Sequence, residues 1–273
     1  MGFKSLMCFG VWILIAACSK ANKNDPPENP AAETVIKTGQ TIRVMTYNIH
    51  HANPPAKVGV IDMEAIAAVI NKEQPDIVFL QEVDVNTTRS GVSLDQAKDL
   101  GIRCNMYSYF TKAINYKEGE YGNAILSKFS LFKQGGRILP NVIGFTGESR
   151  SLAYVGIKTE DNNMIYFAST HLDESRDDNR LRQIKGLFEI NEQLNAPIVL
   201  GGDFNARQGS ESIDLLQQQF KIGCIEDCPV IIDHITLNKK AESIFKVIKY
   251  EIVNDETQAS DHNPVISDIK YKE

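Results

Sequence analysis

Polar clusters at the ends of apolar runs constrain the fold of this chain most. Three clusters follow such runs, at residues 46–50, 80–84 and 201–205, and a fourth, at 260–264, precedes one. Short apolar runs bounded by turn residues are typical of buried strands. Because these four segments are far apart in sequence, we expect one sheet system to bring them together at one edge, as a single site.

The side chains in these clusters are suited to metal-assisted chemistry. Asp203 and Asn205 are two residues apart, which places both side chains on one face of an extended segment. Asp261 stands next to His262. Carboxylate and amide oxygens bind hard divalent cations, and imidazole exchanges protons near neutral pH. The pattern indicates metal-assisted hydrolysis of a phosphate ester, although each cluster taken alone is also typical of a turn after a strand.

The rest of the chain predicts one large domain. Of its 273 residues, 42% are hydrophobic and 23% are charged, which is ordinary for a globular protein. We find no internal repeat and no second linker, and assign residues 41–273 to a single domain. Helical spacing of apolar residues predicts helices over 62–71, 93–100, 180–194 and 212–220, of which 180–194 is the longest. Strands are expected over 42–49, 77–83, 106–110, 124–127, 152–158, 164–170, 198–203, 231–237, 244–253 and 265–271. This mixture predicts a mixed sheet system with helices outside, and antiparallel pairing among the strands between 124 and 170.

The first 40 residues predict export and a lipid anchor. Lys4 precedes an apolar run over 7–17, which is shorter than the ~20 residues of a membrane span but fits an export signal. The run ends at Cys18 in a segment that resembles a bacterial lipobox, so we assign 1–18 to a lipoprotein-type signal peptide. An ordinary signal peptide or a buried N-terminal helix is the alternative. The Pro-rich stretch 19–40 is expected to be a flexible tether. The protein would then be anchored to a membrane of the bacterial cell envelope, on the periplasmic or surface face.

The net charge and the cysteines limit which binding partners and which cellular compartment the protein can have. The formal net charge of −6 argues against strong general affinity for nucleic acids, which relies on many Lys and Arg contacts to phosphates. A local basic groove stays compatible with it. Cys224 and Cys228 could form a disulfide in an oxidising compartment, or less favourably a metal or redox pair. A monomer is favoured, although no feature of the sequence determines the oligomeric state.

Motifs in a characteristic order make the chain resemble the endonuclease/exonuclease/phosphatase superfamily. They occupy residues 46–49, 80–84, 121–127, 148–150, 170–173, 201–206, 232–235 and 260–265. This superfamily includes pancreatic-type deoxyribonucleases, apurinic-site endonucleases, sphingomyelinases and inositol phosphatases. The resemblance covers about residues 41–271 and implies an α/β fold, a four-layer sandwich of two mixed β-sheets packed face to face with helices outside.

The resemblance also implies which residues form the site. The implied metal ligands are Asn48, Glu82, Asp203, Asn205 and Asp261, with Mg²⁺ as the cofactor and Mn²⁺ able to replace it. The implied catalytic residues are His171, Asp203, Asn205, Asp233 and His262. The implied substrate-binding residues are Asn123, Arg150 and His171.

Each of these residues has an assigned role and a plainer alternative. Glu82 would be the central Mg²⁺ ligand, or else only a solvated strand end. Asp203 would orient or deprotonate the attacking water, while Asp233 would determine the tautomer of His262; a loop carboxylate is the alternative for Asp233, as it is for Asp261. Arg150 would contact phosphate, or else form a surface salt bridge.

The sequence thus predicts a Mg²⁺-dependent phosphodiesterase or phosphatase that acts in the cell envelope by in-line attack of water. Two alternatives remain: a nuclease of the same fold, and a binding module that has lost its chemistry. Every matched position carries a side chain competent for its role, which disfavours the binding module. The acidic charge and the membrane tether disfavour a dedicated nuclease.

Overall fold

The structure, a computed structural model, describes residues 1–2, 33–225 and 228–272. The expected lipidation site Cys18, nearly all of the expected signal peptide and residues 19–32 of the expected tether lie outside the described residues. Within the described part of the chain, no helix combines the length and the hydropathy needed to span a bilayer.

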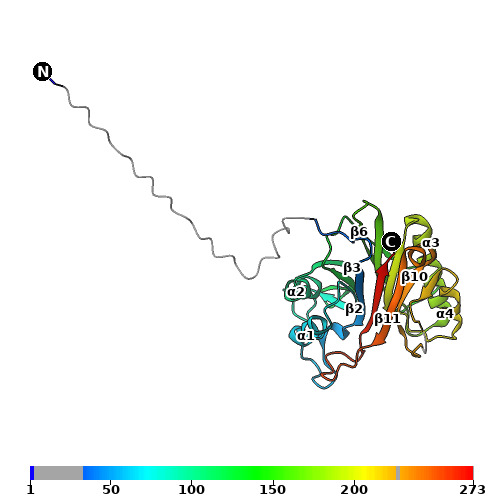
Figure 1. Ribbon diagram of the computed structural model, residues 1–273. Coiled ribbons are helices and arrows are strands. Elements are labelled where there is room, and N and C mark those ends of the chain that lie inside the picture. Colours follow the sequence, from blue (N-terminus) through cyan, green and yellow to red (C-terminus); the bar gives the residue numbers. More distant parts are fainter. Residues whose placement is uncertain (3–32, 226–227, 273) are drawn as a thin grey trace.

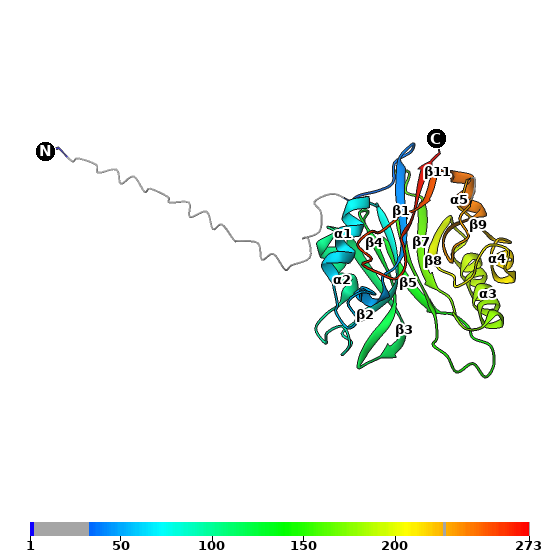
Figure 2. The ribbon, with the colours of Figure 1, turned by 90° about the horizontal axis from the view of Figure 1, so that it is seen from below.

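Two six-stranded sheets pack face to face, and helices cover their outer sides (Figures 1 and 2). The first sheet has the strand order β11 (Phe245–Ile252), β12 (Val265–Tyr271), β1 (Thr41–Asn48), β2 (Ile77–Val85), β4 (Gly119–Ser127), β3 (Tyr107–Tyr116). The second has the order β5 (Lys133–Ile138), β6 (Ser151–Lys158), β7 (Met164–His171), β8 (Ile198–Asp203), β10 (Asp233–Asn238), β9 (Phe220–Ile222). Parallel and antiparallel pairs occur in both sheets. This confirms the expected four-layer α/β sandwich.

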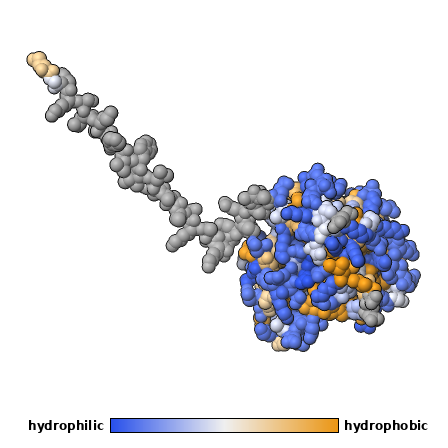
Figure 3. Space-filling model, in the orientation of Figure 1, coloured by the Kyte–Doolittle hydropathy of each residue, from blue (hydrophilic) through white to orange (hydrophobic). Residues whose placement is uncertain are grey.

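The helices bury one apolar face each against the sheets. α1 (Met63–Glu73) and α2 (Gln96–Arg103) pack on the first sheet, and α3 (Asp177–Leu194) and α4 (Glu211–Leu216) pack on the second. The short α5 (Lys239–Ile244) connects β10 to β11, and a 3-10 turn, η1 (His50–Ala52), follows β1. The face of the domain seen in Figure 3 is mostly hydrophilic, with smaller apolar patches, because the apolar faces lie between the layers.

The central core explains why the inner strands have continuous apolar runs. Phe79 of the first sheet and Phe167 and Val199 of the second are fully buried in one cluster between the sheets. A strand that is buried on both faces has no solvent-facing side, so apolar and polar residues do not alternate along it. At Gly201, an added Cβ would lie 2.1 Å from Cδ2 of Phe79, so the glycine makes room for this ring between the sheets.

Most expected elements are confirmed, and the exceptions have physical causes. The expected helix over 212–220 ends at Leu216, because Phe220 is buried in β9 and pairs with β10. The strand β5 was not expected, since its sequence KQGGRI is mostly exposed and has no apolar run. The expected antiparallel pairing holds for β6 and β7, but β4 belongs to the other sheet and the unexpected β5 pairs with β6 instead.

Part of the segment that the sequence assigns to the tether lies against the domain. Ile36 is fully buried in the central core, its backbone nitrogen donates to the carbonyl oxygen of Lys158 (2.9 Å), and it forms a parallel bridge with Thr159. Thr34 is hydrogen-bonded to Ser130 through its backbone nitrogen (3.0 Å). Thr34 and Ile36, which the sequence assigns to the tether, therefore pack against the domain through hydrogen bonds and one buried apolar side chain.

The structure joins Cys224 and Cys228 by a disulfide, with Cα atoms 5.6 Å apart. Of the two alternatives left open by the sequence, it shows the disulfide. The bridge lies in the loop between β9 and β10, and β10 begins at Asp233, one of the expected catalytic residues.

Replacement of Ile36 tests how strongly this segment is held on the domain. We expect Ile36→Ala to lower the free energy of unfolding by about 2–5 kcal/mol, because it leaves a cavity in the central core. Lys37→Ala, at the exposed neighbouring position, should change it by less than about 0.5 kcal/mol. Urea unfolding of both variants measures this, and equal stability of Ile36→Ala and wild type would support a tether that extends to residue 40.

Candidate active site

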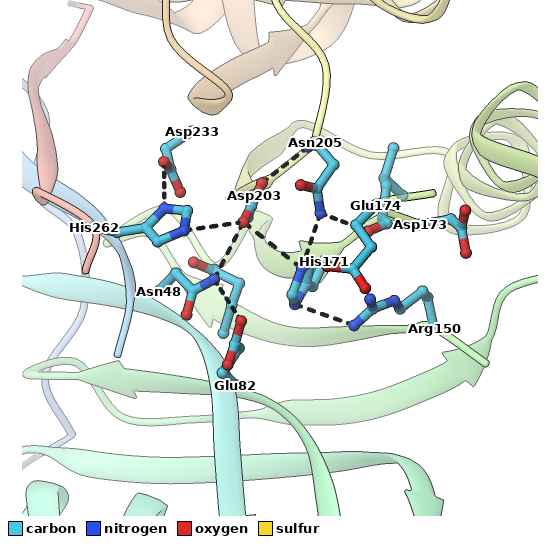
Figure 4. Close-up of polar contacts among 12 residues, drawn as sticks. Asn48, Glu82, Arg150, His171, Asp173, Glu174, Asp203, Asn205, Asp233 and His262 are labelled. Carbon is cyan, nitrogen blue, oxygen red and sulfur yellow. Dashed lines mark hydrogen bonds and ion pairs between the residues drawn. The ribbon is translucent and has the colours of Figure 1, made fainter. Parts of the chain in front are cut away.

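The strand register brings the expected site residues to one edge of the sandwich. β1 and β2 are parallel neighbours that align Asn48 with Gln81, the residue before Glu82. β7 and β8 are also parallel, and they align His171 with Asp203. The antiparallel neighbour β10 places Asp233 beside Asp203 on its other side. Three expected catalytic residues of the second sheet therefore stand side by side, facing Asn48 and Glu82 of the first (Figure 4).

A bulge in β2 directs Glu82 into this site. The register between β2 and β4 shifts between Leu80 and Val83, and Glu82 has a φ of 58°, which is uncommon for a residue other than glycine. Gln81 points between the sheets, where its Nε2 donates to Oγ of Ser169 (3.0 Å). Bulges redirect side chains that strict alternation would place elsewhere. Here the bulge lets Gln81 lie between the sheets while the adjacent Glu82 lies in the site.

Asn48 connects the two sheets through its side-chain amide. Its Nδ2 donates to Oε1 of Glu82 (3.0 Å) and to Oδ2 of Asp203 (3.1 Å). Its Oδ1 accepts from the backbone N–H of His50 (3.1 Å), and this donor determines which way the amide is turned. Asn48 therefore presents its NH₂ group to the two carboxylates and holds them close together.

Asp203, His262 and Asp233 form a buried chain of charges. Nδ1 of His262 donates to Oδ2 of Asp233 (2.8 Å), and Nε2 of His262 lies 3.8 Å from Oδ2 of Asp203. Burial opposes the charged ring, but the hydrogen bond and the negative charges of Asp233 and Asp203 outweigh it and raise the pKa of His262 to about 9. The expected partnership of Asp233 with His262 is thus present as a hydrogen bond that orients the ring.

Asp203 has the environment of a proton acceptor. It is 1% exposed, and burial together with repulsion from Asp233 raises the pKa of its carboxyl well above the ordinary value, against the opposing charge of His262. A carboxylate is a better general base when its pKa is nearer to the working pH. The expected role of Asp203 in preparing water for attack is thus chemically reasonable here.

His171 is held as a neutral ring. Nδ2 of Asn205 lies 3.1 Å from its Nε2, and Nη1 of Arg150 lies 3.4 Å from its Nδ1. Burial, followed by the charges of Arg150 and His262, lowers the pKa of His171 well below its ordinary value. His171 would therefore meet a phosphate as a neutral ring with a single N–H, and not as a cation.

Arg150 and Asn123 keep buried polar atoms without partners. Arg150 is only 4% exposed, so it is not a surface salt bridge, although Glu148 lies 3.7 Å from its Nη1. Nε of Arg150 and Oδ1 of Asn123 have no hydrogen-bond partner among the described residues. An unpaired guanidinium N–H beside the site is suited to an anionic oxygen of a substrate.

Two expected metal ligands have different surroundings. Nδ2 of Asn205 also donates to the carbonyl oxygen of Leu172 (3.0 Å), which leaves its Oδ1 as the atom able to bind a cation. The side chain of Asp261 is 48% exposed and lies 4.0 Å from Nδ1 of His50. The structure does not bring Asp261 together with Asp203 or Glu82 in the described contacts, so its role as a ligand stays a prediction.

Sequence reasoning did not assign two residues that the structure places at the site. Tyr121 is buried, and this burial raises the pKa of its hydroxyl. The charge of Glu82 raises the same pKa further, and the charge of Arg150 lowers it. Oγ of Ser260 donates to the carbonyl oxygen of Asn48 (2.7 Å) and so ties the C-terminal motif to β1. Tyr121 and Ser260 lie within the motifs at 121–127 and 260–265, and those motifs are the only feature of the sequence that points to them.

The donor set suits a divalent cation. Two groups of described side chains have ligand atoms within 4.8 Å of one another: Asp203 with Asp233 and His262, and Glu82 with His50 and His51. Carboxylate oxygens are ligands that hard divalent cations prefer, and imidazole nitrogens bind transition-metal ions.

Comparison with known proteins agrees with this geometry. The sequence pattern of the Endonuclease/Exonuclease/phosphatase family matches residues 45–262. The chain belongs to this family. Endonucleases, exonucleases and phosphatases all hydrolyse phosphoric esters, so this is a family of phosphoric ester hydrolases, and its members generally depend on divalent metals.

Solved structures of the family share the fold. An endonuclease/exonuclease/phosphatase family protein from Bacteroides thetaiotaomicron is similar, with a TM-score of 0.68, 18% identity and coverage of 86% of this chain and 99% of that one. A mannosyl-6-phosphatase from the same organism has a TM-score of 0.65, 19% identity and coverage of 84% and 99%. The human Nocturnin catalytic domain with bound sulfate has a TM-score of 0.67, 20% identity and coverage of 86% and 95%. Comparison with curated proteins gave no match.

The charge on His262 can be tested without turnover. Asp233→Asn replaces the anionic acceptor by a neutral one, so we expect the pKa of His262 to fall by about one to three pH units. NMR titration of the imidazole in the presence of EDTA measures it. Asp178→Asn, an exposed carboxylate paired with Arg176, is the matched control. An unchanged His262 titration in Asp233→Asn would show that the pair does not set the charge.

Proposed function

We propose that this protein is a Mg²⁺-dependent phosphoesterase that acts in the bacterial cell envelope, with Mn²⁺ able to replace Mg²⁺. One observation carries the proposal: Asp203 lies within contact of both halves of the site. Nδ2 of Asn48 donates to it from the Glu82 side (3.1 Å), and Nε2 of His262 lies 3.8 Å away on the Asp233 side. Asp203 as the base, charged His262 as the proton donor and Glu82 as a carboxylate able to bind metal would thus lie around one position.

Glu82, Asn205 and Asp203 would hold the cation through their oxygens. When bound, it would polarise the phosphoryl group and offset the charge that develops on it. The positive charge of the cation is needed because the carboxylates at the site are negative and would otherwise repel a phosphate ester.

The substrate phosphate would lie near Arg150 and Asn123. Nε of Arg150, buried and without a partner among the described residues, donates to a phosphoryl oxygen, and Asn123 lines the same side. His171 would lie beside this phosphate and hold the guanidinium toward it, because Nη1 of Arg150 lies 3.4 Å from its Nδ1. These contacts position the phosphorus atom in front of Asp203.

Proton transfer follows from the two pKa directions. Asp203, whose pKa is raised, accepts a proton from the attacking water, and its charge is balanced by His262. His262 is charged at neutral pH and holds an N–H on Nε2, since Nδ1–H is taken by Asp233. Its Nε2–H would stabilise and protonate the leaving oxygen as the ester bond breaks, the water oxygen would become a phosphate oxygen, and the chain needs no covalent intermediate.

Two measurements test the reaction class. Hydrolysis of bis(p-nitrophenyl) phosphate and p-nitrophenyl phosphate is measured with Mg²⁺, with Mn²⁺ and with EDTA. We expect metal-dependent turnover that falls by about 10²–10⁴-fold in Asp203→Asn and in His262→Ala, because each removes a proton-transfer or charge-stabilising group. The likeness to a mannosyl-6-phosphatase supports adding sugar phosphates to the substrates tested.

Asp178→Asn is the matched control for Asp203→Asn, because it removes the same charge from an exposed helix position. It should retain full activity. Turnover that persists in EDTA, or full activity of Asp203→Asn, would contradict the proposed mechanism. Metal binding without turnover of any ester would favour the binding module.

We also propose that the protein is exported and anchored by lipid at Cys18. The apolar run before Cys18 supports this, and the Cys224–Cys228 disulfide supports it independently, since disulfides persist in oxidising compartments.

The anchor is tested by Cys18→Ser in the full chain. We expect the wild-type protein in the membrane fraction and the variant in the soluble fraction or retained as a precursor, because only the cysteine can take the lipid. Metabolic labelling with a fatty acid gives a direct readout. Equal labelling of both proteins would rule the proposed anchor out.

A further inference from the structure

The turn after β1 has an unusual backbone conformation. His50, His51 and Ala52 have φ values of 44°, 43° and 59°, so three consecutive residues other than glycine lie in the left-handed region. Backbone hydrogen bonds from Ala52 to Ile49 (2.8 Å) and from Asn53 to His50 (2.9 Å) close the turn. Such conformations persist only where the surrounding structure enforces them, and they cluster at ligand sites.

A buried side chain ties this turn to the strand that carries Glu82. Nε2 of Gln96 donates to the carbonyl oxygen of His51 (2.7 Å), and its Oε1 accepts from the backbone N–H of Asp84 (2.8 Å). Gln96 and Asp84 are both fully buried. Asp84 is itself held by two hydrogen bonds from Arg89 (2.7 and 2.9 Å). The network therefore holds the position of His51 relative to Glu82, two residues before Asp84.

The hydrogen bonds of the two histidines leave ring nitrogens free. Nδ1 of His50 lies 2.9 Å from the carbonyl oxygen of Asn53, which can only accept, so Nδ1 carries the proton and Nε2 keeps its lone pair. Metal-binding histidines commonly donate their other ring N–H to a carbonyl in this way. Nδ1 of His51 has no hydrogen-bond partner among the described residues. The two rings stand edge to face, with centroids 4.5 Å apart.

We propose that His50, His51 and Glu82 form a second cation site that selects first-row transition-metal ions over Mg²⁺. A ring nitrogen of each histidine and a carboxylate oxygen of Glu82 lie within 4.8 Å of one another, and all three side chains are partly exposed. Two ligands that each lie about 2.1 Å from a metal can be up to about 4.2 Å apart, so a small contraction closes the site. Water can complete the coordination.

The chemistry of the ligands gives the selectivity. Mg²⁺ prefers oxygen ligands and rarely gives up its waters, whereas imidazole suits transition metals. Asp261, 4.0 Å from Nδ1 of His50, adds negative charge that favours a cation here. This inference deepens the proposed function and rests on it where Glu82 is concerned, because Glu82 would belong to both sites. A carboxylate shared in this way would make the catalytic centre a two-metal centre with unlike ions.

Mn²⁺ is the probe, because pulsed electron paramagnetic resonance detects ¹⁴N nuclei of imidazole bound to it. With the protein from Glu33 onward and with the full chain, we expect ¹⁴N modulation in the wild type. The modulation should weaken in His50→Asn and in His51→Asn, and disappear in the double variant. Asparagine is chosen because it tolerates the left-handed region, so the turn is kept. Calorimetry should show Mn²⁺ affinity lowered by at least about tenfold in the double variant, with Mg²⁺ affinity unchanged.

His262→Asn is the matched control, because it removes an imidazole from the other cluster. It should keep the ¹⁴N modulation and lose hydrolytic activity. Absence of ¹⁴N modulation in the wild type, or its loss in His262→Asn but not in the double variant, would overturn the second site. Modulation that depends on His50 and His51 in a protein that hydrolyses no ester would support the site and contradict the proposed function, so the two failures are distinguishable.

Discussion

The face-to-face packing of the two sheets is the constraint on which the candidate site depends. The first sheet supplies Asn48 and Glu82, and the second supplies Asp203, so neither sheet alone carries the site. The amide of Asn48 joins the halves by donating to both carboxylates. Below this contact, the ring of Phe79 fills the space left by Gly201. A small shift between the sheets would separate these groups, and displacements of about 1 Å are costly in catalysis.

The site has buried carboxylates on one side and a buried guanidinium on the other. Asp203 and Asp233 are buried beside each other, and charged His262 balances only part of their charge. Buried carboxylates without compensation are unfavourable, and a divalent ion offsets them. Arg150 lies on the other side, with a buried N–H that no described residue accepts. In the proposed function, a phosphate bound to a metal ion would compensate the charges on both sides.

The buried elements were predictable from sequence, and the edges of the fold were not. β8 and β12 lie where the apolar runs predicted them, because strands buried on both faces leave a strong signal. β5 left none, since an exposed edge strand with two glycines has no apolar face. The segment around Ile36 was missed for a related reason: one buried side chain cannot be told from a tether by composition. In the site, the motifs identified the residues, while the bulge at Glu82 and the turn at His50 have no sequence signal.

The sequence by itself determined which polar residues end the inner strands, and therefore which side chains meet and what class of chemistry they can perform. Parallel pairing turns strand ends that are distant in sequence into neighbours, so order along the chain was sufficient. Only the tertiary structure decided the protonation states. Burial lowers the pKa of His171, whereas the partner Asp233 raises the pKa of His262, although both follow or precede similar apolar runs. The reason is physical: a pKa depends on burial and on partners brought together by folding, such as Asp233, 29 residues from His262.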